Sequence, residues 1–192
     1  MPAVADAALR RLLDVTVAGA LLIILSPVLA LLAVLVRATS PGPALFRQTR
    51  VGRNGRLFVL LKLRTMRADA AHTGPAITAG ADPRITPLGA QLRRTKLDEL
   101  PQLWNVLRGD MTLVGPRPIV PEELGKYGEY SRMLLRVKPG VTGFWQVNGR
   151  STVGYPERAR MDLQYVAERS VQEDVQILLR TLPAVLRRRG AV

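Results

Sequence analysis

The sequence predicts an α+β protein that is mostly helical, with a short β-hairpin and an N-terminal membrane helix. Three features carry this prediction: a long uncharged apolar segment, two apolar runs that flank an Asn-Gly pair, and helical spacing of apolar residues further along the chain. The 192 residues suffice for one compact domain beside a membrane element. We therefore expect residues 1–39 to form the membrane element and residues 40–192 to form one domain.

The membrane element is predicted from 22 consecutive uncharged residues, Val15 to Val36. As a helix this segment measures about 33 Å, which is enough to cross a hydrocarbon core of roughly 30 Å. Basic residues flank the segment on both sides: Arg10, Arg11, Arg37, Arg47, Arg50 and Arg53. Because the flanks show no charge asymmetry that would orient a simple span, we expect both ends on the cytoplasmic side.

Ser26 and Pro27 lie near the middle of the apolar segment. Proline removes a backbone donor and clashes with the carbonyl four residues earlier, so it tends to kink a helix. A helix bent here could enter and leave the bilayer on the same side as a re-entrant segment. A single-pass anchor with a tolerated proline accounts for the same residues, so both topologies remain open from the sequence.

A β-hairpin is predicted after the Ser-Pro-Gly-Pro break at residues 40–43. The apolar runs ALFRQTRV and RLFVLLKL stand on either side of Asn54-Gly55, a strong short-range hairpin signal. Residues 69–88 then contain several glycines and prolines without clear periodicity, which predicts a long loop. Long loops of this kind are often functional.

Helices are predicted over the rest of the chain. Apolar residues recur at three- and four-residue spacing from about Gln91 to Leu107, but Pro101 requires a break. We place Asp98 as the N-cap of a new helix that runs to Arg108, with Glu99 in its first turn. Two further helices are expected at residues 156–169 and 171–189, the second interrupted at Pro183. The last helix is basic and amphipathic, which suits either a bilayer surface or packing against the core with a solvated arginine tail.

The composition excludes several kinds of chemistry. The chain has no cysteine and one histidine, His72, so disulfide frameworks, thiol catalysis and zinc sites built from cysteine and histidine are ruled out. A bound metal would have to be a hard cation held by carboxylate and phosphate oxygens, with Mg²⁺ the natural candidate. The sequence contains neither Asp-x-Asp nor a Walker-type glycine loop.

The net charge of +13 predicts an anionic partner. Nucleic acid is the weakest option, because two Trp, four Tyr and three Phe offer few side chains on which bases could stack. An anionic membrane surface and a phosphorylated substrate remain as candidates. A non-catalytic, membrane-anchored basic protein would satisfy the same charge balance.

Asp98-Glu99 is the best candidate for a reactive pair. A carboxylate at a helix N-terminus is held ionised by the helix dipole and lies where backbone N–H groups favour an incoming phosphate, so Asp98 could attack phosphorus. On spacing alone, a helix cap followed by a first-turn acid is the simpler explanation of the same two residues. His72 is interpreted as a solvated loop residue.

Several basic residues are candidates for phosphate binding. Arg117 lies between two prolines in VGPRP, which fixes the backbone as extended and restricts its guanidinium, although a rigid loop with a surface ion pair is an alternative. The other candidates lie near turns or strand ends: Lys62, Arg64, Arg93, Arg94 and Arg150.

Taken together, these stretches resemble the bacterial sugar transferases, the monotopic polyprenyl-phosphate phosphoglycosyl transferases. The resemblance covers nearly the whole chain and rests on four segments: the apolar segment with Ser26-Pro27, KLRTM at 62–66, RRTKLDELPQLWNVLRGDMTLVGPRP at 93–118 and KPGVTGFWQVNGR at 138–150. It implies transfer of a sugar 1-phosphate from a UDP-sugar to undecaprenyl (polyprenyl) phosphate, with release of UMP. The product would start exopolysaccharide, O-antigen or glycoprotein glycan assembly.

The resemblance also implies roles for particular residues. Asp98 would form a covalent aspartyl-phosphosugar intermediate and bind Mg²⁺, and Glu99 would assist it. The substrate-binding residues would be Lys62, Arg64, Arg93, Arg117, Arg150 and Asp162, while Asp174 has a less defined role. Ser26-Pro27 would break a re-entrant helix, which makes the protein monotopic, with residues 40–192 as a catalytic domain on the cytoplasmic face of the bacterial inner membrane.

Two points distinguish this chain from the family pattern. Tryptophans common in relatives between the last two helices are replaced by ERSVQEDVQIL at 168–178, which weakens aromatic anchoring at the interface. The chain is also expected to be the minimal catalytic form. Anionic lipids are expected partners, nucleic acid is not, and the sequence leaves a homo-oligomer, the transferred sugar, another nucleotide and another acceptor open.

Overall fold

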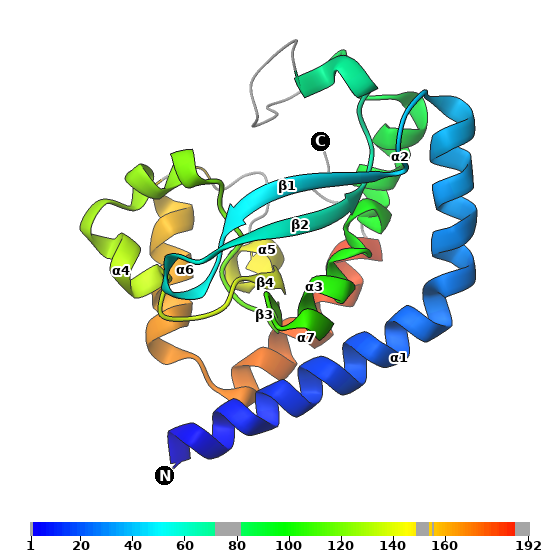
Figure 1. The fold of residues 1–192 in the computed structure, drawn as a ribbon. Coiled ribbons are helices and arrows are strands. Elements are labelled where there is room, and N and C mark those ends of the chain that lie inside the picture. The colour runs from blue at the N-terminus through cyan, green and yellow to red at the C-terminus, as the bar shows by residue number, and fades with distance from the viewer. Residues whose placement is uncertain (1, 72–81, 149–153, 155, 187–192) are drawn as a thin grey trace.

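The computed structural model describes residues 2–71, 82–148, 154 and 156–186 (Figure 1). A long bent helix α1 (Pro2–Thr39) runs along one edge of the molecule and then up one side, and the hairpin strands β1 (Leu45–Val51) and β2 (Leu57–Leu63) lie across the middle (Figure 1). The predicted combination of helices, a short hairpin and one long apolar helix is confirmed.

Helix α1 is one continuous helix with Pro27 inside it. Its stretch Asp6–Thr39 has a mean hydropathy of 2.8 in the most apolar window, of which only 11% is buried, so it is not a core helix of the domain. The Ser26 hydroxyl donates to the Ile23 carbonyl at 2.8 Å. The bend in α1 (Figure 1) agrees with the kink expected from a proline in a helix interior.

Both ends of α1 are fastened to the same domain. Near its start, Arg11 donates to the carbonyls of Val106 and Leu107 at 2.7 and 2.8 Å, and Asp14 accepts from the Thr112 hydroxyl at 2.9 Å. Buried Ala18 belongs to the main core cluster. At the other end, Val36 packs with Leu63 and Leu92 in a separate cluster. The bent helix thus returns to the domain from which it departs.

The β-hairpin is confirmed where it was expected. Strands β1 and β2 pair antiparallel from Leu45↔Leu63 to Val51↔Leu57. The connecting turn η1 (Arg53–Gly55) places Asn54 at φ 58° and Gly55 at φ 77°, in the left-handed region that these two residues tolerate. This register puts every second residue of each strand on the side that faces the candidate site.

Helix α2 (Pro87–Thr95) begins earlier than predicted, because the Thr86 side chain accepts from the backbone N–H of Gly89 and so caps it. The predicted break near Pro101 is confirmed, since the short turn η3 (Leu97–Glu99) separates α2 from α3 (Gln102–Arg108). The assignment of Asp98 as N-cap was wrong, because Asp98 lies inside η3 and Pro101 precedes α3. The end at Arg108 is confirmed, with Gly109 at φ 87°.

The remaining elements enclose the core. Strands β3 (Thr112–Val114) and β4 (Gly140–Thr142) form a parallel pair that the sequence did not reveal. Helices η4 (Pro121–Tyr130), α4 (Ser131–Leu134) and α5 (Phe144–Asn148) follow in chain order around them. Of the predicted loop at 69–88, residues 69–71 lie in the short turn η2 (Ala68–Ala71), residues 72–81 lie outside the described structure, and residues 82–86 lead into α2.

The two C-terminal helices are confirmed as α6 (Glu157–Glu168) and α7 (Val171–Leu186). The predicted interruption at Pro183 was wrong, because α7 continues through this residue. Tyr165 of α6 and Ile177 of α7 contribute to the core that α3 and β3 also line.

Candidate functional site

The two adjacent carboxylates lie on the tight turn between α2 and α3. Lys96 ends α2 in the left-handed conformation, at φ 60°, and so redirects the chain into η3. Within η3 the Asp98 side chain is buried, with 5% of the residue exposed, and the Glu99 side chain is 16% exposed. Both acidic groups are therefore largely withdrawn from solvent, and of the two only Glu99 lines the pocket described below.

Glu99 is paired with Lys62 of β2. Lys62 Nζ lies 2.9 Å from Glu99 Oε1, and Lys96 Nζ lies 3.8 Å from the same oxygen. The positive charges of Lys62 and Lys96 hold the pKa of Glu99 well below its usual range, although burial alone would raise it. Burial lowers the pKa of the Lys62 ammonium, which the charge of Glu99 partly opposes. Glu99 is therefore an ionised member of a fixed ion pair.

Asp98 has different surroundings. Burial and the neighbouring charge of Glu99 raise the pKa of Asp98, while Lys62, Lys96 and Arg93 act in the opposite direction. Its Oδ1 atom is buried without a hydrogen-bond partner among the described residues. A carboxylate oxygen in this situation is available to a cation or to an electrophile such as phosphorus.

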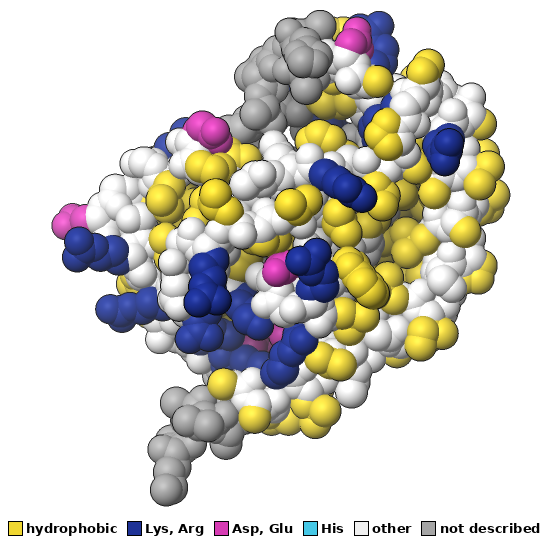
Figure 2. Space-filling model, in the orientation of Figure 1, with side chains coloured by type: hydrophobic (Ala, Val, Ile, Leu, Met, Phe, Trp, Pro, Cys, Tyr) yellow, Lys and Arg dark blue, Asp and Glu magenta, His cyan; other side chains and the backbone are white. Residues whose placement is uncertain are grey.

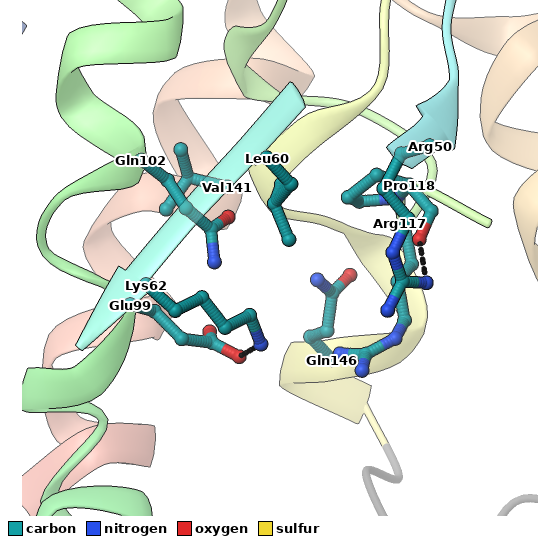
Figure 3. Close-up of a pocket in the computed structure, with 9 residues that line it drawn as sticks. All are labelled: Arg50, Leu60, Lys62, Glu99, Gln102, Arg117, Pro118, Val141 and Gln146. Carbon is teal, nitrogen blue, oxygen red and sulfur yellow. Dashed lines mark hydrogen bonds and ion pairs between the residues drawn. The ribbon is translucent and has the colours of Figure 1, made fainter. Parts of the chain in front are cut away.

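A small pocket opens beside this pair (Figure 3), and its lining residues are Arg50, Leu60, Lys62, Glu99, Gln102, Arg117, Pro118, Val141 and Gln146. Lys62 and Glu99 form one side, and Arg50 and Arg117 form the opposite side, with Gln146 between them (Figure 3). On the face drawn in Figure 2, Lys and Arg side chains gather around a few acidic ones, beside the hydrophobic surface of α1. The pocket is thus polar and basic.

Arg50 comes from β1 and is buried, with 8% of the residue exposed. Its guanidinium donates to the Pro118 carbonyl at 2.9 Å and to Gln48 Oε1 at 2.6 Å, and it lies 3.7 Å from Glu123 Oε2. Burial, followed by the charge of Arg117, lowers the pKa of Arg50 to about 10. The arginine remains charged at neutral pH, and it connects the hairpin to the loop that carries Arg117.

The Arg117 loop is held by close backbone contacts. Gly115 N–H donates to the Thr142 carbonyl at 2.9 Å, and Gly140 N–H donates to the Pro116 carbonyl at 2.8 Å. A Cβ atom added at Gly140 would lie 2.1 Å from the Gly115 nitrogen, so only glycine permits this approach. The rigid loop expected from the two flanking prolines is therefore also fixed by the β3–β4 pair.

Asp162 of α6 lies behind this loop, at 1% exposure. The Tyr127 hydroxyl donates to its Oδ2 atom at 3.2 Å. Burial raises the pKa of Asp162 to about 7, against the charge of Arg158, the Tyr127 hydroxyl, and the charge and backbone N–H of Arg117. Asp162 is therefore placed to support the Arg117 loop from behind, and it does not line the pocket.

The other predicted site residues have separate positions. Arg93 donates from Nε to the Thr65 hydroxyl at 2.8 Å, and burial lowers its pKa, while the charge of Asp98 opposes that shift. The guanidinium of Arg64 does not line the pocket and instead donates to the carbonyls of Ser40 at 2.6 Å and of Pro41, at the end of α1. Arg150 and His72 lie outside the described residues.

Three polar pocket residues were missed in the sequence: Arg50, Gln102 and Gln146. Arg50 was noticed only as a basic residue flanking the apolar segment. Strand alternation could have placed it, together with Gln48, on one face of β1, but the cross-strand register was needed to bring that face next to Lys62. Gln102 and Gln146 carry no sequence signal that would separate them from ordinary helix residues.

A divalent metal would find few protein ligands among the described residues. No group of three or more His, Cys, Asp and Glu side chains that could hold a metal occurs among them. Asp98 nevertheless offers a buried, unpartnered carboxylate oxygen. Mg²⁺ commonly binds through one or two carboxylates together with substrate phosphates and water, so this single oxygen fits a cation that arrives with a phosphorylated substrate.

The fold and site define a protein with one long apolar helix and a basic pocket beside a buried carboxylate pair. A family model described as bacterial sugar transferase matches residues 5–188, and the chain belongs to this family. The exopolysaccharide production protein ExoY of Rhizobium meliloti is 40% identical, over 95% of this chain and 87% of its own length.

Two further relatives have names that state a reaction. The undecaprenyl-phosphate galactose phosphotransferase of Salmonella typhimurium is 42% identical over 95% of this chain. The UDP-glucose:undecaprenyl-phosphate glucose-1-phosphate transferase of Caulobacter vibrioides is 42% identical over 97% of this chain and 73% of its own length. The chain spans less than half of the Salmonella protein, 41% of its length.

Proposed function

We propose that the protein transfers a sugar 1-phosphate from a UDP-sugar to undecaprenyl (polyprenyl) phosphate and releases UMP. The observation that carries this proposal is the buried, unpartnered carboxylate oxygen of Asp98, the residue before Glu99, which lines a pocket together with Arg50, Lys62 and Arg117. The names of the Salmonella and Caulobacter relatives, which specify undecaprenyl phosphate and a hexose 1-phosphate, support the same reaction class.

In the first step, an Asp98 carboxylate oxygen attacks the β-phosphorus of the donor. The bond from that phosphorus to the bridging oxygen breaks, and UMP leaves with the electron pair. In the second step, an oxygen of polyprenyl phosphate attacks the same phosphorus, and the bond to Asp98 breaks. Splitting the transfer in this way is covalent catalysis, and no proton has to be gained or lost overall.

The charged residues around Asp98 have separate physical tasks in this scheme. The ion pair with Lys62 fixes Glu99 in its charged form, so Glu99 orients the site and raises the pKa of Asp98 without competing as a nucleophile. Arg117 binds phosphate oxygens from a loop that cannot shift, and Arg93 adds positive charge near Asp98. Fixed positive groups of this kind stabilise the charge that develops during phosphoryl transfer.

Asp98 Oδ1 is the protein oxygen that would hold Mg²⁺, together with the diphosphate of the donor. The cation would neutralise part of the negative charge that the carboxylate meets as it approaches the donor. The protein residues supply the remaining positive charge, from Lys62, Arg93 and Arg117.

The attachment of α1 supports a re-entrant membrane helix, which is continuous and bent, with Ser26-Pro27 inside it, where the sequence predicted a break. Its first turns are bonded to α3 and β3, and its last turn packs on β2 and α2, so one domain holds both ends. A helix that crosses the bilayer completely has its two ends on opposite sides. It could not contact a single domain at both ends. We place the domain on the cytoplasmic face of the bacterial inner membrane, where nucleotide sugars are found.

The C-terminal helices complete the membrane-facing surface in this proposal. Val175 and Leu179 of α7 are 42% and 71% exposed, and Trp104 of α3 is 51% exposed. Apolar side chains of this size, on a basic protein, favour an interface with anionic lipids. The polyprenyl chain of the acceptor would reach the pocket from the same side. The name of the Rhizobium relative supports exopolysaccharide assembly as the pathway, with this reaction as its first membrane step.

The experiment that tests the proposal is a UMP-release assay across a panel of UDP-sugars, with polyprenyl phosphate and Mg²⁺. The Asp98→Asn variant should release no UMP, because the amide is a poor nucleophile. The variant should still associate with membranes. Mass spectrometry of the wild-type protein after incubation with the donor alone should find a phosphosugar adduct on Asp98.

The control is Asp6→Asn, an exposed acidic residue near the start of α1, which should leave turnover unchanged. Normal turnover by the Asp98→Asn variant would rule out Asp98 as the nucleophile. Binding of anionic lipids with no UMP release from any donor would favour a non-catalytic basic protein instead.

A further inference from the structure

Gln102 is a buried polar residue of the pocket lining to which the proposed reaction assigns no task. Only 3% of the residue is exposed, and its side chain extends from α3 into the pocket (Figure 3). Its side-chain amide makes no hydrogen bond with the other residues that the structure describes. An amide kept from water without a partner is costly, so this side chain has the character of a group that a ligand satisfies.

The backbone places Gln102 beside the acidic pair. Leu100 and Pro101 join η3 to α3 and have φ −54° and −61° with ψ −36° and −16°, so the chain stays right-handed helical between Asp98 and Gln102. Residues three and four positions apart on such a turn are neighbours, with about 5–6 Å between their Cβ atoms. Gln102 therefore lies one turn after Asp98 and Glu99, on their side of the helical backbone.

The chemistry of a neutral amide limits what Gln102 can bind well. The amide offers two N–H donors and one acceptor oxygen, whereas the oxygens of an ionised phosphate only accept. The charged side chains of the lining, Arg50, Lys62 and Arg117, are the stronger donors to phosphate. The amide instead matches a group that both donates and accepts, such as a hydroxyl or an acetamido group.

The position next to Asp98 limits which group of this kind is within reach, and this step rests on the proposed function. The nucleobase is separated from the reacting phosphorus by the ribose and the α-phosphate, so it lies far from a residue one turn after Asp98. The transferred sugar is bonded to that phosphorus through its anomeric oxygen. Its nearest substituent that both donates and accepts is on C2, because the ring oxygen only accepts.

We propose that Gln102 binds the C2 substituent of the transferred sugar, a hydroxyl or an acetamido group, and so selects donors that carry a polar group at this carbon. The amide N–H donates to the oxygen of the substituent, and the amide oxygen accepts from its O–H or N–H. The sugar stays bonded to the phosphorus in both steps, so the contact persists in the intermediate on Asp98. No covalent bond forms or breaks at Gln102.

The experiment is a cycle of one residue change and one donor change. It combines Gln102→Met with the UDP-sugar that the wild-type protein uses and with the 2-deoxy analogue of that donor. Methionine keeps nearly the length of glutamine and favours a helix, but it lacks the amide donors and acceptor. Gln91→Met, at an exposed position in α2, is the matched control. The measurements are kcat/KM for each donor and the dissociation constant of UMP.

In the wild-type protein and in Gln91→Met, kcat/KM for the 2-deoxy donor should be about 10-fold below that for the parent donor, the loss typical of one hydrogen-bonded contact. In Gln102→Met, kcat/KM for the parent donor should fall by the same factor. The 2-deoxy donor should then equal the parent, because the contact is already absent. The dissociation constant of UMP, which lacks the transferred sugar, should be the same in all three proteins.

Full discrimination against the 2-deoxy donor in a folded Gln102→Met variant would overturn the proposal, as would a wild-type protein that does not discriminate. Weaker UMP binding with that discrimination intact would place Gln102 on the nucleotide and would overturn it as well. Gln102→Leu is the second variant, and loss of the folded state in both, with a folded Gln91→Met, would make Gln102 a structural residue and end the proposal. Failure of the proposed function is distinct, because the wild-type protein would then release no UMP from any UDP-sugar.

Discussion

Asp98 and Glu99 are adjacent residues with opposite electrostatic surroundings. Lys62 and Lys96 hold the pKa of Glu99 well below its usual range, whereas burial and the charge of Glu99 raise the pKa of Asp98. Two carboxyl groups with separated pKa values can take different roles at one pH. Asp98 is the more basic of the two and is therefore the better nucleophile once it is ionised.

The pH dependence of UMP release should report this difference. Asp98 must be deprotonated to attack, so activity is lost as the pH falls through its raised pKa, and the acid limb should lie above the ordinary aspartate pKa of about 3.9. In Glu99→Gln the neighbouring negative charge is absent and Lys62 is unpaired. Both changes lower the pKa of Asp98, so the acid limb should move to lower pH even though the overall rate falls.

The measurement is the single-turnover rate constant for UMP release between acidic and neutral pH, with the donor alone as substrate so that the acceptor phosphate does not contribute. Glu129→Gln, at an exposed position of η4, is the control and should keep the wild-type profile. An acid limb that stays in place in Glu99→Gln would mean that Asp98 is not the ionising group.

At the scale of elements, the end of α1 depends on Arg64. Its guanidinium donates to the carbonyls of Ser40 and Pro41, and to the Gly42 and Val36 carbonyls at 3.3 and 3.4 Å. The last carbonyls of a helix have no partner inside the helix, so a buried arginine can satisfy them. We interpret Arg64 as a cap that joins α1 to the hairpin.

This interpretation predicts that Arg64→Gln lowers the free energy of unfolding by about 1–3 kcal/mol, because buried carbonyls lose their donors. The KM for the UDP-sugar should change little. Chemical unfolding and UMP-release kinetics of the purified protein measure the two effects. Arg37→Gln, at an exposed position in the last turn of α1, is the control and should alter neither quantity appreciably. A raised KM with unchanged stability would instead favour the substrate contact expected from the family resemblance.

At the scale of the whole molecule, the bent helix and the domain form one object. The Arg10–Asp174 ion pair at 2.9 Å joins the start of α1 to α7, while the main core cluster includes residues from α1, β2, α3, β3, α6 and α7. A helix held in this way cannot leave its ends on opposite sides of a bilayer without breaking these contacts. Membrane topology and domain packing are therefore coupled.

Single cysteines introduced at Ala7 and Thr39, both exposed, should therefore react with an impermeant thiol reagent from the same side of sealed inner-membrane vesicles. The natural chain has no cysteine that would give a background signal. Labelling from the cytoplasmic side at both positions is the expected result. Labelling of the two positions from opposite sides would establish a single-pass anchor.

The candidate site shows where sequence reasoning stops. The acidic pair, Lys62 and Arg117 were all found from local signals: a carboxylate pair beside a helix break, a strand end, and an arginine between prolines.

An Asn-Gly pair by itself favours a two-residue turn, whereas here the loop contains three residues, 53–55, and Gly52 N–H bonds to the Arg56 carbonyl at 2.8 Å. A difference of one residue in register moves every side chain of one strand to the other face. The position of Arg50 beside Arg117 and on the side of Lys62 could therefore not be read from the turn.

The sequence by itself determined the elements whose causes are local: the apolar helix, its proline, the hairpin, the break before α3 and the end of that helix at Gly109. Only the tertiary structure decided which charges meet. Contacts such as Arg11 with α3, Arg64 with the end of α1 and Arg50 with the Pro118 carbonyl join residues far apart in the chain. The reason is physical, because hydrogen-bonding partners and desolvation depend on distances in space, whereas turns, caps and helical periodicity depend on neighbours in the chain.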